Sequence, residues 1–287
     1  MKQVFSVAVL LVIATGVFAQ KKKKTVPQPM SCCAIASTQQ FARFANDKEF
    51  MMMHANPLPF TFVSEKGGKD ITYKAADGSD AYGYEIKADK KTNYYIFVIH
   101  EWWGLNDYIK QQAEKLNKDF GVNVIALDLY DKKVAATQED AGKYMQEANT
   151  TRIENIIKGA IKYAGADAKI FTIGWCFGGG WSLQASMLAG KQAAGCIMYY
   201  GMPEKNTDKL KALHADVLGL FANKEQWITP QIVNEFEATM KKLGKNITVY
   251  RYDAVHAFAN PSNPNHDKAA TEDAYKHVTE FLKARIK

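Results

Sequence analysis

The chain has 287 residues, of which 47% are hydrophobic and 23% are charged. These proportions are those of a globular protein with ample material for a core, and they exclude a disordered or fibrous chain. The net charge of +7 comes largely from Lys2 and the lysine run at 21–24. The rest of the chain is close to neutral, so we interpret the run as a solvated tail and expect no nucleic-acid partner.

The first 19 residues have the pattern of an export signal. Lys2 precedes an apolar run at residues 4–13, and Val17-Phe18-Ala19 reads as the cleavage site. A membrane anchor is the alternative, but the apolar stretch of about 16 residues is shorter than the roughly 20 needed to span a bilayer. We therefore expect an exported, periplasmic or secreted protein with no stable membrane span after cleavage.

Residues 20–58 are expected to form a polar leader and a helical arm. One helix is predicted at 38–53, because apolar residues recur there at roughly helical spacing, and Pro57 and Pro59 end the segment. The arm is expected to pack on the main domain without forming a domain of its own.

Strands and helices alternate along the remaining residues, 59–287. Strands are predicted at 80–87, 94–100, 122–127, 169–173, 194–200, 217–221 and 247–252, and helices at 107–120, 139–165 (as one or two), 177–189, 230–243 and 267–286. The strands are nearly continuous apolar runs, which favours an α/β fold with a mostly parallel sheet covered by helices on both faces. In such sheets the chemistry lies at the carboxyl ends of the strands.

Cys176 has the strongest signal for chemistry. The segment Gly174-Trp175-Cys176-Phe177-Gly178 follows a predicted strand and precedes a predicted helix, which is the setting of a nucleophile elbow. A sharp turn exposes the nucleophile there, and the helix amino terminus favours a thiolate. The alternative is a merely structural cysteine, which the strand–turn–helix context disfavours.

His256 and Glu225 are the predicted partners of Cys176. His256 follows the last predicted strand, where this kind of fold has its general base, and Glu225 follows the strand at 217–221, where the acidic residue is expected. Asp253 is close to His256 in sequence and remains the alternative for the acid.

These residues, together with the segments 98–106 and 256–258, resemble the dienelactone hydrolase family from about residue 75 to the end of the chain. The resemblance implies a single-domain α/β-hydrolase that opens lactones or cleaves esters with a cysteine, an acid and a histidine. It also implies that Glu101 contacts the resting thiol and helps to control its ionisation. The expected oxyanion hole consists of the backbone N–H groups of Phe177 and, by resemblance, Trp102.

The chain departs from the family pattern in the residues that would hold a substrate carboxylate. The resemblance implies two arginines, but this chain has Asn260 four residues after the histidine and Gln138 as the nearest match in the helix after Tyr130. Dienelactone itself is therefore not the expected substrate, because the bidentate anchors are missing. Trp103, Trp175 and Asn260 are the predicted substrate-binding side chains, although buried core is an equally good interpretation of each tryptophan.

The sequence thus predicts a cofactor-independent hydrolase of small-molecule esters or lactones. A scaffold that has lost activity and binds a ligand or partner is the alternative, and the sequence does not indicate the oligomeric state. No metal is predicted, because His100-Glu101 lacks the second histidine of the zinc motif. Cys32 and Cys33 could bind a metal with His54 or exchange thiols, but their adjacency does not favour either role.

Overall fold

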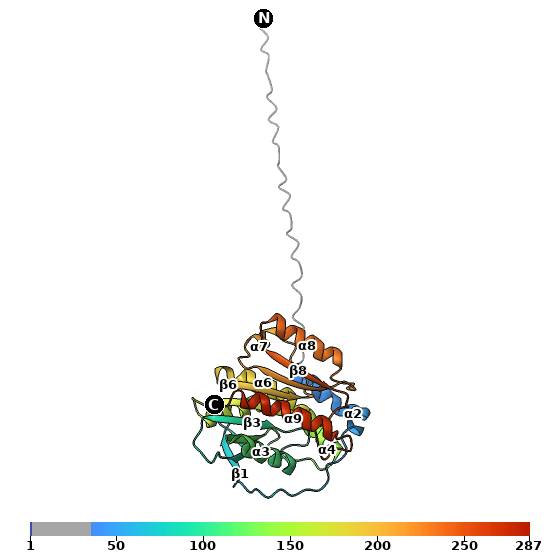
Figure 1. Cartoon of the computed structure of the whole chain (residues 1–287). Coiled ribbons are helices and arrows are strands. Elements are labelled where there is room, and N and C mark those ends of the chain that lie inside the picture. Colours follow the sequence, from blue (N-terminus) through green and yellow to red (C-terminus); the bar gives the residue numbers. More distant parts are fainter. Residues whose placement is uncertain (2–35) are drawn as a thin grey trace. The chain divides into compact units, whose positions relative to one another are not determined.

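The computed structural model describes Met1 and residues 36–287 (Figure 1). The predicted signal sequence, most of the leader, Cys32 and Cys33 lie outside the described residues. None of the helices in the described part of the chain is long and apolar enough to cross a membrane.

Eight strands form one sheet in the order β1-β2-β4-β3-β5-β6-β7-β8. The first two strands run antiparallel to their neighbours and the other six are parallel. Their bounds are β1 Lys69–Lys74, β2 Asp80–Ile86, β3 Tyr94–Ile99, β4 Asn123–Asp128, β5 Lys169–Trp175, β6 Ala193–Tyr199, β7 Val217–Ala222 and β8 Ile247–Tyr252. The predicted fold class, a mostly parallel α/β sheet, is confirmed.

The helices after the arm are α3 Asp107–Phe120, α4 Gln138–Glu147, α5 Thr150–Ala164, α6 Phe177–Ala189, α7 Thr207–Lys211, α8 Pro230–Lys242 and α9 Lys268–Lys283, with a short 3-10 turn, η2, at Gly190–Gln192. On one face α9 packs beside α3, where the Tyr275 hydroxyl donates to Asp119 (Figure 1). In the sheet, β4 and β5 lie on opposite sides of β3. The connection from β3 through α3 to β4 therefore crosses the sheet toward β1, and the connection from β4 through α5 to β5 crosses it toward β8. Right-handed crossovers therefore put α3 and α5 on opposite faces of the sheet.

The arm does not contain the single helix predicted at residues 38–53. Three short helices replace it: α1 Ser37–Ala42, η1 Arg43–Asn46 and α2 Lys48–Met52. The break comes at Asp47, whose backbone is extended and whose carboxylate accepts hydrogen bonds from the N–H groups of Glu49 and Phe50. An aspartate in this role caps a new helix. The roughly helical spacing of the apolar residues continues across Asp47 and concealed this break in the sequence.

Two small elements were not predicted. β1 is an edge strand in which only Tyr73 is fully buried, so its charged and polar residues conceal the alternation that marks a strand. α7 is a helix of five residues, too short to show a period. The predicted helical region at 139–165 is two helices, separated where Asn149 caps α5 by accepting from the Arg152 N–H.

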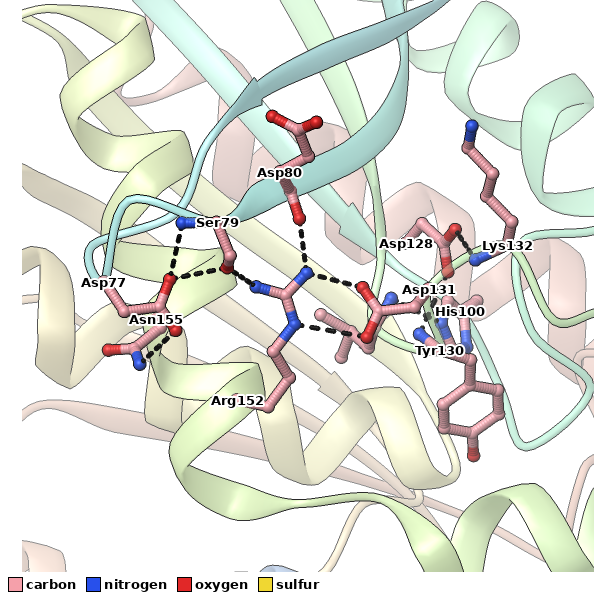
Figure 2. A network of polar contacts seen from close by, with 11 residues as sticks. Asp77, Ser79, Asp80, His100, Asp128, Tyr130, Asp131, Lys132, Arg152 and Asn155 are labelled. Carbon is pink, nitrogen blue, oxygen red and sulfur yellow. Dashed lines mark hydrogen bonds and ion pairs between the residues drawn. The ribbon is translucent and has the colours of Figure 1, made fainter.

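Arg152 ties three separate segments together beside this helix (Figure 2). Its guanidinium donates two hydrogen bonds to the Asp131 carboxylate, from Nε at 3.1 Å and from Nη2 at 2.5 Å. It also donates to the Ser79 hydroxyl and the Asp80 carbonyl, so it joins α5 to the β1–β2 turn and to the segment after β4. Arg152 therefore has a structural role here.

Replacing Arg152 with alanine should lower the free energy of unfolding by about 1–2 kcal/mol. The substitution removes two hydrogen bonds to the Asp131 carboxylate, each worth up to about 1.5–3 kcal/mol, and two to neutral partners, but solvent around this partly exposed cluster screens them. Urea denaturation of the variant measures the change. Arg43→Ala, at an exposed arginine of the arm, is the matched control, with an expected change within about 0.5 kcal/mol; equal stability of the two variants would contradict the role given to Arg152.

Candidate active site

Cys176 stands on a sharp turn between β5 and α6. Its backbone φ is +56°, a left-handed conformation that is costly for a residue with a Cβ and that occurs mostly at functional sites. The turn needs its two glycines. A Cβ on Gly174 would lie 2.1 Å from the Gly178 carbonyl oxygen, and a Cβ on Gly178 would lie 2.4 Å from the carbonyl oxygens of Ile99 and His100. The elbow predicted from the sequence is therefore present, and it holds the sulfur above the amino terminus of α6.

His256 lies between Cys176 and Glu225. Its Nδ1 is 2.6 Å from Glu225 Oε2, and its Nε2 is 3.2 Å from the Cys176 sulfur. Because a carboxylate can only accept a hydrogen bond, Nδ1 carries the proton and Nε2 presents a lone pair to the thiol. Asp253, the alternative acid, is exposed and pairs with Lys224 at 3.0 Å, so the structure joins Glu225 and not Asp253 to the histidine.

Two backbone N–H groups approach the Cys176 sulfur. They belong to Phe177 and Trp102, the predicted oxyanion donors, and both act to lower the pKa of the thiol. Burial of the thiol has the largest influence and raises its pKa, and the negative charge of Glu101 raises it further. Together they outweigh the two N–H groups, so the pKa of Cys176 lies well above its ordinary value. In this arrangement Cys176 rests as a neutral thiol and needs a base to become a nucleophile.

Glu101 follows β3 and is buried beside the site. Its carboxylate accepts a hydrogen bond from Asn260 Nδ2 at 2.6 Å and another from the Tyr200 hydroxyl at 3.4 Å. Burial raises the pKa of Glu101 to about 7, although the nearby His256 and these two donors oppose the rise. Glu101 therefore acts on Cys176 through its charge, and Asn260, predicted to bind substrate, holds Glu101 in place.

Replacing Glu101 with glutamine should make Cys176 easier to ionise. Loss of the negative charge favours the thiolate, so the pH midpoint of alkylation by iodoacetamide should move downward. Because the pKa of Glu101 is about 7, the wild-type charge is present above that pH and lost below it. The variant should therefore exceed the wild type most clearly above about pH 7.

The rate of Cys176 alkylation between about pH 5 and 9, followed by peptide mass spectrometry, tests this prediction. Glu114→Gln removes a buried carboxylate of α3 that hydrogen-bonds to the Glu65 N–H, and it should leave the profile unchanged. An upward shift in Glu101→Gln, or equal shifts in both variants, would refute the prediction.

His54, in the arm, is a further site residue that the sequence pattern did not connect with Cys176. Its ring is buried, and its Nε2 lies 3.7 Å from the Cys176 sulfur, across 122 positions of sequence. The neighbouring Phe50 is fully buried and packs against the rings of His54, His256 and Trp102. No local period or spacing links a histidine of the arm to a distant elbow, so only the density of phenylalanines before it hinted at burial.

Polar side chains of the main domain hold the arm over the site. Gln138 Nε2 donates to the carbonyls of Met51 at 2.7 Å and His54 at 2.6 Å. Asn263 Nδ2 donates to the Met53 carbonyl at 2.8 Å. Gln138, the nearest match to one of the two arginines that the family resemblance implied, therefore binds the arm here.

A cavity of about 370 Å³ opens beside the elbow. Its walls include Glu101, Trp103, Trp175, Tyr199 and Asn260, among them all three predicted substrate-binding residues. Cys176 itself has no exposed surface, because Phe50 and His54 of the arm cover that side of the site. A substrate in this cavity would reach the sulfur only after the arm or the side chains between them shift.

His100, which ends β3, has a structural position. Its Nδ1 donates to the Glu101 carbonyl at 2.6 Å, and its Nε2 accepts from the Leu129 N–H at 3.1 Å. Burial lowers its pKa to about 4, so the ring is neutral and links the ends of β3 and β4 (Figure 2).

Comparison with known proteins gives consistent matches. The profile of the Dienelactone hydrolase family matches residues 80–286. Carboxymethylenebutenolidase 1 of Cupriavidus pinatubonensis is 25% identical over 230 residues, which cover 75% of this chain and 95% of that protein.

Solved structures share the fold. A dienelactone hydrolase-like promiscuous phosphotriesterase from metagenomic libraries has a TM-score of 0.66 at 17% identity, covering 77% of this chain and 99% of that one. An esterase of Pyrococcus furiosus has a TM-score of 0.61 at 15% identity, covering 82% and 100% of the two chains. At these identities the structural likeness extends to the fold alone.

Proposed function

Because this chain belongs to the dienelactone hydrolase family, we propose that it hydrolyses ester or lactone bonds with Cys176 as nucleophile, His256 as base and Glu225 as the orienting acid. The observation that carries the proposal is the unbroken contact from Glu225 through His256 to the Cys176 sulfur, at 2.6 and 3.2 Å. A buried carboxylate, an imidazole and a thiol in this order can move one proton and activate one nucleophile.

The proposed reaction begins when His256 Nε2 takes the thiol proton. The thiolate attacks the substrate carbonyl carbon, and the resulting oxyanion accepts hydrogen bonds from the N–H groups of Phe177 and Trp102. Fixed donors of this kind contribute several kcal/mol, roughly 3 each. The imidazolium, stabilised by Glu225, then returns the proton to the leaving alkoxide, which in a lactone stays attached to the acyl group. Water, activated by the same histidine, cleaves the thioester and restores the thiol.

The cavity favours an uncharged, partly aromatic substrate. Trp103, Trp175 and Tyr199 supply flat apolar surface, which suits an aryl or unsaturated ring. Asn260 lies where one carboxylate-binding arginine is implied, and Gln138 is the nearest match to the other; both hydrogen-bond to protein partners. We therefore propose neutral aryl esters or aryl lactones in preference to a dienelactone carboxylate.

Detection of an acyl group on Cys176 tests the proposal. The full chain is mixed with p-nitrophenyl acetate, quenched in acid within the first turnovers, and digested for mass spectrometry. Acetyl on the peptide that carries Cys176, lost again on longer incubation, is the expected result. Release of nitrophenol without acetylation of that peptide would refute the mechanism. No release at all with neutral aryl esters and lactones would favour a scaffold that binds a ligand or partner.

We also propose that the protein is exported to the periplasm or secreted, on the strength of the signal pattern in residues 1–19. Expression in a bacterium with a working secretion pathway, followed by amino-terminal mass analysis, tests this. A chain that begins at Gln20 outside the cytoplasm is expected, and an uncleaved cytoplasmic chain would refute export.

A further inference from the structure

Three metal-binding side chains converge at the elbow. The donor atoms of His54, Cys176 and His256 all lie within 4.8 Å of one another, and all three side chains are buried. The proposed hydrolysis uses only His256 and Cys176 of this group. The presence of a second imidazole nitrogen 3.7 Å from the reactive sulfur is therefore not explained by the triad.

Both histidines present a lone pair to the sulfur. His54 Nδ1 donates to the Phe50 carbonyl at 2.7 Å, and His256 Nδ1 donates to Glu225 at 2.6 Å. In each neutral ring the proton on Nδ1 leaves Nε2 unprotonated. The thiol has one proton, so it can satisfy one of the two Nε2 atoms at a time, and the other remains a buried acceptor without a donor, which is costly.

The separations fit one metal ion. Zinc binds imidazole nitrogen at about 2.0–2.1 Å and thiolate sulfur at about 2.3 Å, so tetrahedral angles put these atoms about 3.6 Å apart. The observed nitrogen–sulfur distances are 3.7 Å for His54 and 3.2 Å for His256. Both nitrogen–sulfur separations are thus within about half an ångström of the value for a shared ion. The two histidine nitrogens lie within 4.8 Å of each other, and a separation of about 3.4 Å between them would complete the coordination shell.

The surroundings of the histidines also match a metal site. Metal-binding histidines commonly donate their other ring N–H to a carboxylate or a backbone carbonyl, and here His256 uses a carboxylate while His54 uses a carbonyl. Imidazole and thiolate together select a borderline-soft ion such as Zn²⁺ over Mg²⁺ or Ca²⁺.

We propose that His54, Cys176 and His256 bind Zn²⁺ and that the bound ion holds the hydrolase in an inactive state with the arm closed. Coordination forms a zinc–sulfur bond and releases the thiol proton to solvent, while each histidine gives a lone pair and no proton. The nucleophile and its base are then both occupied. Because His54 belongs to the arm, the same ion fixes the arm over the site, in addition to the contacts from Gln138 and Asn263.

Binding of Co²⁺ as a spectroscopic probe tests the site without depending on catalysis. The full chain is used with Cys32→Ser and Cys33→Ser, so that neither of those thiols contributes. One Co²⁺ per chain with a thiolate-to-metal charge-transfer band is expected, and Zn²⁺ should displace it. Absence of that band at saturating Co²⁺ would overturn the proposal, whether or not the protein hydrolyses esters.

His54→Phe separates the three-ligand site from a site formed by Cys176 and His256 alone. Phenylalanine keeps a ring in the arm but has no lone pair, and circular dichroism checks its folding. The expected result is a loss of Zn²⁺ affinity of about 100-fold or more, since even partners that only support a ligand are worth 10–100-fold. His214→Ala, at an exposed histidine outside the site, is the control and should bind as the wild type does. Equal affinity in the two variants would overturn the role of His54.

Protection of the thiol gives a second readout. Zn²⁺ should slow alkylation of Cys176 in the wild type and much less in His54→Phe, as followed on the peptide that carries the residue. Equal slowing in both proteins would contradict a site that includes the arm. If the protein proves active, Zn²⁺ should inhibit hydrolysis by the wild type more strongly than hydrolysis by His54→Phe. If it proves inactive, the Co²⁺ and alkylation results still test the metal site.

Discussion

Replacing Cys176 with alanine is expected to lower kcat for aryl ester hydrolysis by about 10⁵–10⁶-fold. The substitution removes the proposed nucleophile, and loss of the nucleophile from a comparable triad has an effect of this size. The oxyanion amides of Phe177 and Trp102 would remain, so a small rate above that of water should persist. KM should change little, because Cys176 does not line the substrate cavity.

Initial rates with a chromogenic ester measure this effect. Cys196→Ala is the matched control, because Cys196 is also a buried thiol but its sulfur faces Ser182 within the core. It should retain wild-type kcat. If the Cys176→Ala protein kept more than a few percent of wild-type activity, or if both variants lost activity equally, Cys176 would not be the nucleophile.

Replacing Glu225 with glutamine is expected to lower kcat by about 10³–10⁴-fold. The glutamine amide can donate a hydrogen bond to His256 Nδ1, which favours the tautomer that carries its proton on Nε2 and directs it at the sulfur. The histidine can then no longer accept the thiol proton, and a change of this kind in a related triad has an effect near 10⁴. The imidazolium that forms during attack also loses its buried counter-charge.

Asp253→Asn is the control for this variant, because it changes the alternative acid by the same chemistry. Asp253 pairs with Lys224 at the surface, so its loss should alter kcat by less than about twofold, as expected for an exposed pair. A large loss in Asp253→Asn with little change in Glu225→Gln would reverse the assignment of the acid.

The sequence predicted the parts of the site that follow from chain order in a parallel sheet. The three residues follow parallel strands whose carboxyl ends point to the same end of the sheet. Cys176 follows β5, Glu225 follows β7 and His256 follows β8. The elbow glycines were visible because a sharp turn requires them at fixed spacing. The Phe177 oxyanion donor was predicted from the same geometry, whereas Trp102 was predicted from the family resemblance.

The contribution of the arm could not be predicted in this way. Its breaks depend on Asp47, whose carboxylate caps α2 and also accepts from the Trp227 side chain at 3.1 Å. The position of His54 depends on the burial of Phe50 among aromatic rings from distant segments. Such packing is tertiary, so no local pattern reports it. The edge strand β1 was also missed because its strand structure depends on tertiary contacts. It is a strand because it pairs with β2, and not because of apolar alternation.

Gln138 has an evolutionary consequence. It binds the arm from the position that is the nearest match to one of the implied carboxylate-binding arginines, so the two uses would compete for one side chain. A mutation to arginine at 138 would offer a new anchor for a carboxylate, and a guanidinium turned toward that carboxylate would give up the hydrogen bonds to Met51 and His54. A lineage that adapts toward acidic substrates would therefore pass through forms with a loosened arm. Substrate range and shielding of the thiol are expected to evolve together, as opposing demands on one side chain.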